Sequence, residues 1–177
     1  MPLKQFTDEE WKIFNELKET SKNIYVDDAR IIWPNFSGRE TAYNKEGDRN
    51  FCVRLDSDKL LDSAMSSGYN VKYRAEGEDS IPFLKINVVF GDNRYPCQVF
   101  MKSRGKVTEL KEDTVSLVDS SDILKANVII QPKPWVINKD RYGIAARLKA
   151  LYLTVSEDKY AEEFFDEENE DEMIPFD

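Results

Sequence analysis

The chain has 177 residues, of which 41% are hydrophobic and 33% are charged, and its formal net charge at pH 7 is −9. It contains no histidine, which excludes Ser-His-Asp and Cys-His catalytic sites and removes the commonest metal ligand. No apolar run reaches the ~18 residues that span a bilayer, and residues 1–6 lack a secretory signal, so we expect a soluble, cytoplasmic protein.

The first predicted element is a helix over residues 8–22. Thr7 and Glu10 have the spacing of a capping box, in which each side chain bonds the backbone N–H of the other residue. Trp11 and Phe14 lie on one face of this helix. Such an apolar stripe either docks on the chain's own domain, which is the simpler interpretation, or joins two copies in a homo-oligomer.

Strand-like segments separated by turns make up most of the following chain. The pattern predicts strands at residues 23–33, 50–56, 69–74, 81–90, 94–102, 126–131 and 144–155. Hairpin turns are expected at residues 91–93 and 103–106, and Pro34 and Pro132 are expected to end strands. The last strand segment also fits a helical spacing, but the turn that precedes it favours a strand.

One short helix interrupts the strands, with Ser57 as its expected N-cap and Gly68 at its end. Residues 113–123 fit either a short helix or a loop. Because no alternation of strands with long helices is visible, the pattern predicts a β-rich α+β domain. Cys52 and Cys97 lie in strand-like segments without metal-ligand spacing, so we expect reduced, buried thiols.

Cationic and aromatic side chains recur together on loop-like and edge segments, above all in the long polar loop at residues 35–49. Single-stranded nucleic acid is bound by this mixture, because cations follow the phosphates and aromatic rings stack on the bases. The alternative for each residue is an ordinary core aromatic or a solubilising surface cation. The candidate nucleic-acid-binding residues are Trp33, Phe36, Arg39, Tyr43, Lys45, Arg49, Arg54, Lys72, Tyr73, Arg74, Lys102, Arg104, Lys106, Trp135, Arg147 and Lys149.

The acidity of the chain is concentrated at its C-terminal end. Residues 157–177 contain eleven Asp or Glu and one Lys, whereas residues 30–156 contain 20 Lys or Arg and 16 Asp or Glu. A block of like charge stays solvated, and this one ends in the apolar residues 173–176. We therefore interpret the tail as a recognition element on a weakly basic domain. A purely solubilising tail is the alternative.

Sites for chemistry are scarce in this sequence. Neither a GxxxxGK[ST] nor a GxGxxG phosphate loop is present. Asp56, Asp58 and Asp62 could form a magnesium site of the nuclease kind, but a carboxylate in the first turn of a helix is favoured by the helix dipole alone. We expect a binding protein without metal, cofactor or enzymatic activity, and keep a metal-dependent nuclease as an alternative.

Four features carry a resemblance to a known family: the strand at residues 50–55, the turn at residues 103–106, the stretch at residues 143–152 and the acidic tail. Together they resemble single-stranded DNA-binding proteins of the OB-fold type, in particular those encoded by bacteriophages. The tail is similar to the tip of bacterial single-stranded DNA-binding proteins, where a disordered acidic segment ending in Ile-Pro-Phe docks onto replication and repair proteins. Here Asp177 follows Phe176, whereas the bacterial Phe is terminal.

The resemblance implies an OB-like antiparallel barrel with an N-terminal helix, one short inserted helix and a disordered acidic C-terminal tail. It divides the chain into an N-terminal helical extension at 1–22, an OB-like nucleic-acid-binding domain at 23–156 and an acidic tail with an apolar tip at 157–177. The protein would bind and protect single-stranded DNA with little sequence preference during replication or recombination, in the host cytoplasm if it is encoded by a phage.

The resemblance also implies that the tail recruits replication or recombination proteins. The implied partner-binding residues are Asp171, Glu172, Met173, Ile174, Pro175 and Phe176. The alternative from another functional class is a protein-binding adaptor, or an inhibitor that mimics DNA, with the tail as its working surface.

Overall fold

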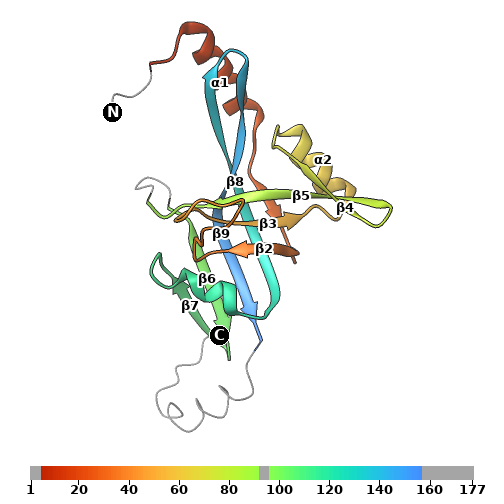
Figure 1. Ribbon diagram of the computed structural model, residues 1–177, viewed down its shortest axis with the longest axis vertical. Helices are drawn as coiled ribbons and strands as arrows, with labels where there is room; N and C mark the ends of the chain where they lie inside the picture. Colours follow the sequence, from red (N-terminus) through yellow and green to blue (C-terminus); the bar gives the residue numbers. More distant parts are fainter. Residues whose placement is uncertain (1–4, 92–95, 157–177) are drawn as a thin grey trace.

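A computed structural model describes residues 5–91 and 96–156 of the chain (Figure 1). The helical elements of these residues are α1 (Asp8–Thr20), α2 (Asp58–Ser66) and the 3-10 helix η1 (Val115–Ser120). The strands are β1 (Ile24–Val26), β2 (Ile31–Asn35), β3 (Arg49–Arg54), β4 (Lys72–Glu76), β5 (Asp79–Val88), β6 (Gln98–Ser103), β7 (Lys106–Leu110), β8 (Ile123–Asn138) and β9 (Arg141–Val155). None of the helices in these two ranges is long and apolar enough to cross a membrane.

The strands form one mixed sheet in the order β1-β8-β9-β5-β3-β2, with β4 added to β5, β6 added to β9 and β7 added to β6. Two pairings are parallel, because β5 and β6 each lie along β9, at Ile86↔Ala146 and from Gln98↔Ala150 onward. The β-rich architecture with an N-terminal helix and a short inserted helix is confirmed. The expectation of a purely antiparallel sheet is wrong, and the pairing of the described strands does not close a barrel.

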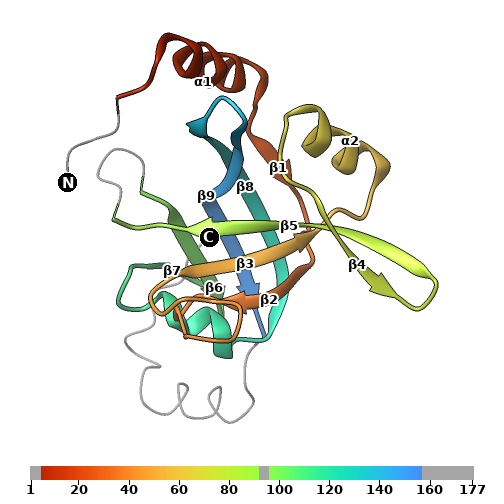
Figure 2. The same cartoon turned by 45° about the horizontal axis from the view of Figure 1, so that its top comes forward.

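Two sets of strands cross each other in this sheet. Figures 1 and 2 show β2, β3 and β5 running across the long β8–β9 hairpin. The hairpin at residues 91–93 was predicted wrongly, since β6 pairs with β9 and β7 and not with β5. Residues 92–95 of that connection lie outside the described residues.

The hydrophobic core lies where the two sets of strands cross. Phe36 and Phe51 are fully buried and stack with their ring centroids 5.0 Å apart. They pack with the inward side chains of β5 and β9, such as Ile86 and Leu148. Burial of these large apolar groups supplies the main free energy of folding.

Local signals define the helix ends as the sequence predicts. Thr7 and Glu10 form the capping box, with Glu10 N donating to Thr7 Oγ1 over 3.2 Å and Thr7 N donating to Glu10 Oε1 over 3.0 Å. Ser57 caps α2 by accepting from Leu60 N. Gly68 follows α2 with a φ of 84°, a conformation that favours glycine.

The β8–β9 hairpin is longer than the sequence predicts, because β8 continues through Pro132 and Pro134. Both prolines face β9 partners, and beyond Ile130 the other edge of β8 is not paired with a described strand. Proline is tolerated at such an edge, since its missing N–H is not required there. The helix α1 packs on β8, near the end of the hairpin (Figure 1).

Candidate nucleic-acid interface

The strand register places polar and aromatic side chains on one face of the sheet, which we call the outer face. Along β5, Leu84 and Ile86 are buried, so Phe83, Lys85 and Asn87 point to the opposite side. Directly paired residues of neighbouring strands share a face. The outer face therefore also contains the partners Arg54, Lys72, Cys52 and Arg147, and on β8 the residues Gln131, Lys133 and Trp135.

Two adjoining hollows lie beside β5 and β9, and we call them together the groove. The first, of about 410 Å³, lies where the outer face meets the base of the β2–β3 loop, and the second, of about 540 Å³, lies between β5 and the β8–β9 hairpin. They share Asn87 and Ala145 in their lining. The two hollows therefore adjoin each other at β5 and β9.

The lining of the groove is predominantly cationic. Its charged side chains are the cations Arg49, Lys72, Lys85, Lys133 and Arg147 and the acids Asp48 and Glu112. Burial raises the pKa of Cys52 to about 11, and the charges of Lys85 and Lys72 act on this thiol in the opposite direction. Both lysines thus lie close to the same point of β3. A concave surface with an excess of positive charge attracts a polyanion.

Aromatic rings lie at one end of the groove. Trp135 and Tyr142 line it and are both partly exposed. A Cβ atom on Gly143 would lie only 3.0 Å from Cζ2 of Trp135, so the absence of a side chain at this position lets the indole lie close to β9. The indole consequently lies against β9, and Trp135 remains partly exposed.

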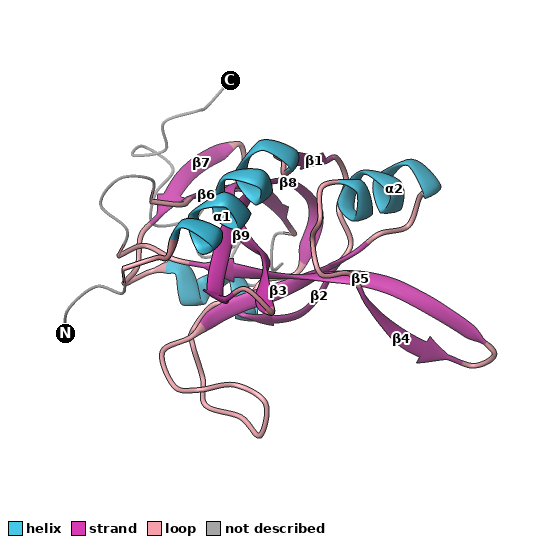
Figure 3. Ribbon diagram, turned by 90° about the horizontal axis from the view of Figure 1, so that it is seen from above, coloured by secondary structure: helices cyan, strands magenta, loops and turns pink. Residues whose placement is uncertain are grey.

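A second aromatic group lies on the outer face at β2, β4 and β5. Trp33 meets Phe83 edge to face with ring centroids 5.2 Å apart, and Cζ of Arg74 lies 5.1 Å from the Trp33 ring centroid. Lys72 and Arg54 are the two cross-strand partners of Phe83, so they border this group. Figure 3 shows that the β4–β5 hairpin, which carries Arg74, reaches away from the rest of the sheet.

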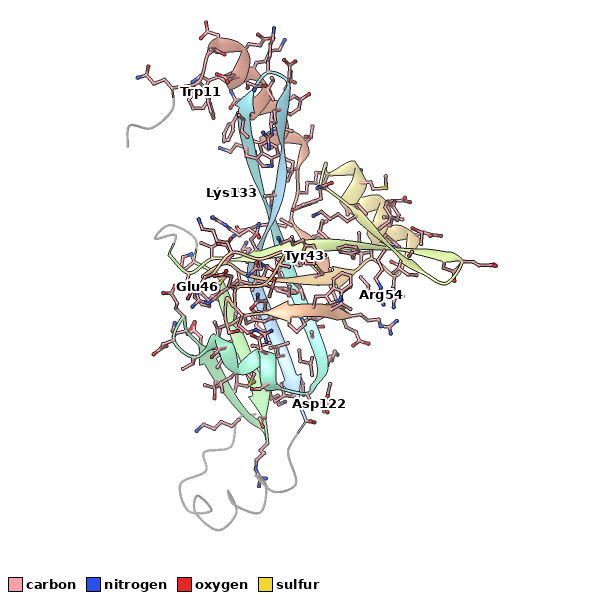
Figure 4. All side chains as sticks on the ribbon, viewed as in Figure 1. Trp11, Tyr43, Glu46, Arg54, Asp122 and Lys133 are labelled. Carbon is pink, nitrogen blue, oxygen red and sulfur yellow. The ribbon has the colours of Figure 1, made fainter. Side chains whose placement is uncertain are left out.

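The loop between β2 and β3 projects from the body beside the groove (Figure 3). Its interior is held by Asn44, whose side-chain nitrogen donates to the carbonyls of Arg39 and Asp48 over 2.8 and 3.0 Å. Tyr43 at its tip is 96% exposed. Figure 4 shows Tyr43 and Glu46 of this loop, Arg54 of β3 and Lys133 of β8 around the middle of the molecule.

The structure brings many of the sequence-predicted residues together and separates others. Arg49, Lys72, Trp135 and Arg147 line the groove, and Trp33, Arg54 and Arg74 lie beside it on the outer face. Arg39, Tyr43 and Lys45 belong to the projecting loop, and all three are exposed. These placements leave their role in binding DNA a prediction.

Five of the predicted residues lie elsewhere. Lys102, Arg104 and Lys106 belong to the β6–β7 hairpin at the lower end of the molecule in Figure 1. Tyr73 pairs with Pro82 and so lies on the face of β4 opposite to Lys72 and Arg74. Lys149 is exposed on β9. It lies between Leu148 and Ala150, where the register of the β8–β9 pairing shifts.

Phe36 requires a correction. Its ring is fully buried against Phe51, while its backbone N–H donates to the carboxylate of Asp119 over 2.8 Å. A base could not stack on this ring without opening the core, so we remove Phe36 from the candidate interface. The groove also includes three residues that are not among the candidate residues named above, namely Lys85, Lys133 and Tyr142. The alternation of polar and apolar residues along β5 could have identified Lys85 from the sequence.

Two further expectations concern the partner-binding tail and a carboxylate metal site. The partner-binding residues 171–176 lie outside the described residues. Within residues 5–91 and 96–156, no three His, Cys, Asp or Glu side chains gather as metal ligands, and Asp56, Asp58 and Asp62 do not converge. The nuclease alternative therefore lacks its carboxylate cluster in this part of the chain.

Comparison with known proteins gives a family match over most of the chain. A family model described as a putative phage ssDNA-binding domain matches residues 15–175. No curated protein matches the chain.

Similar solved structures come from two bacteriophages. The single-stranded DNA-binding protein from bacteriophage Enc34 is 13% identical with a TM-score of 0.48, both as a C-terminal truncation and in complex with ssDNA. The match covers 77% of this chain, and 87% and 88% of the two solved chains. The single-stranded DNA-binding protein gp2.5, encoded by bacteriophage T7, is 11% identical with a TM-score of 0.41, over 88% of this chain and 99% of that chain.

Proposed function

The chain belongs to the phage single-stranded-DNA-binding domain family, and on that premise we propose that the groove is the site that holds the DNA strand. The family is one of DNA-binding domains and not of enzymes. The observation that supports this site is the combination of five cations with Trp135 and Tyr142 along two adjoining hollows. Cations neutralise phosphates, and each aromatic ring stacks on a base for about 1 to 3 kcal/mol.

The proposed mechanism is passive and stoichiometric. Stacking on aromatic faces and contact with phosphates require bases that are not enclosed in a duplex, but they do not depend on base identity. The protein would therefore coat single strands with little sequence preference, prevent hairpins and block nucleases. It would act during replication or recombination in the host cytoplasm.

The acidic tail is proposed to have two roles. Residues 157–177 carry eleven carboxylates, so they can compete with DNA phosphates for the cationic groove when no strand is bound. When DNA displaces the tail, its apolar tip at residues 173–176 becomes available to replication or recombination proteins. This proposal keeps the division into a helical extension at 1–22, a DNA-binding domain at 23–156 and a tail at 157–177.

The test is a binding assay with fluorescently labelled oligothymidylate and with a duplex of equal length, each with and without magnesium. We expect tight, strongly salt-dependent binding of the single strand, weaker binding of the duplex and intact DNA in every sample. Failure to bind the single strand would support the adaptor alternative, and fragments formed only with magnesium would support the nuclease.

Deletion of residues 162–177 tests the tail separately. The truncated chain should bind oligothymidylate more tightly than the full chain at low salt, and the difference should shrink as salt screens the tail. A matched chain in which the acids of residues 162–172 are replaced by Gln or Asn, with the tip retained, separates competition by charge from recruitment by the tip. Equal affinities of all three chains would contradict the competition.

A further inference from the structure

Three cations from three different strands surround the first hollow of the groove. Arg49 begins β3, Lys133 lies on β8 and Arg147 lies on β9. The charges of Arg49 and Arg147 both act on the buried thiol of Cys97, which places the two guanidinium groups near the same point. A hollow of about 410 Å³ with this lining has the charge and the size for a phosphate group.

An acidic side chain already reaches into this hollow. Oε2 of Glu112 lies 3.9 Å from Nη1 of Arg49, and Glu112 is among the residues that line the hollow. Its side chain is 60% exposed, whereas that of Arg49 is 24% exposed. The carboxylate thus lies on the solvent side of the guanidinium, where an incoming anion would arrive.

The turn that carries Glu112 is fixed by hydrogen bonds. Lys111 N donates to Thr114 Oγ1 over 2.9 Å, and Val115 N donates to the carbonyl of Lys111 over 2.8 Å. The turn joins β7 to η1, and η1 is tied to the β2–β3 loop because Asp119 accepts from the backbone of Phe36 and Ser37. Glu112 is therefore held at the hollow and is not on a freely moving segment.

The contact leaves Arg49 incompletely satisfied. Nε of Arg49 is buried and has no hydrogen-bond partner among the described residues. A buried donor without an acceptor is costly. The 3.9 Å contact between Nη1 and Glu112 Oε2 is longer than a hydrogen bond, so a phosphate oxygen that accepts from Nη1 at closer range would satisfy this guanidinium better.

We propose that this hollow is a subsite for a DNA phosphate and that Glu112 occupies it as an internal substitute until the DNA strand displaces its carboxylate. The inference rests on the proposed function of the groove. Because DNA must break the Arg49–Glu112 pair in order to bind, the pair lowers the affinity for DNA, and it offsets part of the positive charge of the empty hollow. The expected penalty is about two- to fivefold in affinity, as for an exposed ion pair.

The test uses the full-length chain and labelled oligothymidylate at low salt. Glu112→Gln should tighten binding by roughly two- to fivefold, whereas Asp113→Asn, which removes the same charge at an exposed neighbour outside the hollow, should change it less. Arg49→Gln should weaken binding and reduce the slope of log affinity against log salt by about 0.7, the value for one phosphate of a single strand. In a chain that already carries Arg49→Gln, Glu112→Gln should tighten binding of oligothymidylate by no more than Asp113→Asn does.

Several outcomes overturn the inference. An equal gain in affinity from Glu112→Gln and from Asp113→Asn shows that only long-range charge matters. An equal gain in affinity from Glu112→Gln with and without Arg49 shows that Glu112 does not act through Arg49. If Arg49→Gln fails to fold, Lys133→Gln replaces it, and an unchanged salt slope for that exposed residue contradicts a phosphate subsite. If the unaltered chain does not bind oligothymidylate at all, the proposed function and this inference fall together; if it binds and only these variants behave otherwise, the inference alone fails.

Discussion

The guanidinium of Arg74 lies over the indole of Trp33, with Cζ 5.1 Å from the ring centroid. The two residues come from different strands, β4 and β2, and Phe83 of β5 meets the same indole edge to face. Trp33 also has a φ of 49°, a conformation that is rare for a bulky residue and is retained only when its surroundings enforce it. The indole is thus fixed in place although 50% of Trp33 is exposed, which suits a preformed surface for base stacking.

Replacing Trp33 with Ala should weaken binding of oligothymidylate by about 1 to 3 kcal/mol, because one stacking face is lost. Fluorescence anisotropy at constant salt measures this change. Trp11→Ala is the matched control, since Trp11 is equally exposed at 49% but lies on α1 at the far end of the β8–β9 hairpin. Equal losses from the two variants would contradict a specific role of Trp33.

Phe36 and Tyr43 should separate stability from binding. Phe36→Ala removes a fully buried ring and should lower the free energy of unfolding by about 3 to 5 kcal/mol. Tyr43→Ala removes a ring that is 96% exposed and should leave that free energy within about 0.5 kcal/mol. Urea unfolding followed by circular dichroism measures both changes.

In the DNA-binding assay, Tyr43→Ala should have the larger effect of the two variants. Tyr43→Ala should weaken DNA binding if the projecting loop contacts the strand, and the folded fraction of Phe36→Ala should bind with unchanged affinity. Retained affinity in Tyr43→Ala would place the loop outside the interface.

Local chemistry explains which parts of the fold were predictable. The capping box of Thr7 and Glu10, the N-cap Ser57 and the left-handed Gly68 involve residues within a few positions of each other, so sequence patterns define them. The parallel pairing of β6 with β9 depends on residues about 50 positions apart. No local pattern distinguishes it from the expected hairpin with β5.

The same limit applies to the candidate site. Trp33 and Phe36 are both aromatic residues near the end of a strand, yet one is half exposed and the other is buried. The difference arises from a register shift of β2 between Ile32 and Asn35, together with the left-handed backbone of Trp33. Such a bulge redirects the side chains that follow it.

The two buried thiols predict a loss of stability in alkali. Burial raises the pKa of Cys52 and of Cys97 from 9.0 to about 11. Between pH 9 and 11 the unfolded chain therefore loses thiol protons that the native chain retains, so the native state loses roughly 2 kcal/mol per thiol as pH rises through this window. Urea midpoints at pH 8 and above pH 10 measure this loss.

The chain with Cys52→Ala and Cys97→Ala is the control for this prediction. This chain should lose less stability as pH rises from 9 to 11. Part of the loss that remains comes from Tyr69, whose pKa is also raised by burial. Identical losses in the two chains would show that the thiols are not responsible. At pH 8 both thiols should also resist alkylation in the native chain, since the thiolate is the reactive form.

Lys85 tests whether the outer face, and not only its aromatic residues, contacts the DNA. It is exposed on β5, pairs with Cys52 and lines the second hollow of the groove. Lys85→Gln should weaken binding to all single strands alike and reduce the salt slope by about 0.7, because one phosphate contact is lost.

Lys12→Gln is the charge-matched control for Lys85→Gln, since Lys12 is also exposed but lies on α1. It removes the same unit of charge away from the groove, so its salt slope should equal that of the unaltered chain. Both slopes are measured by titrating preformed complexes with salt. A reduction of equal size in the two variants would mean that net charge, and not a phosphate contact at β5, determines the salt dependence. A reduction in Lys85→Gln alone would place a phosphate of the bound strand beside β5, in the second hollow of the groove.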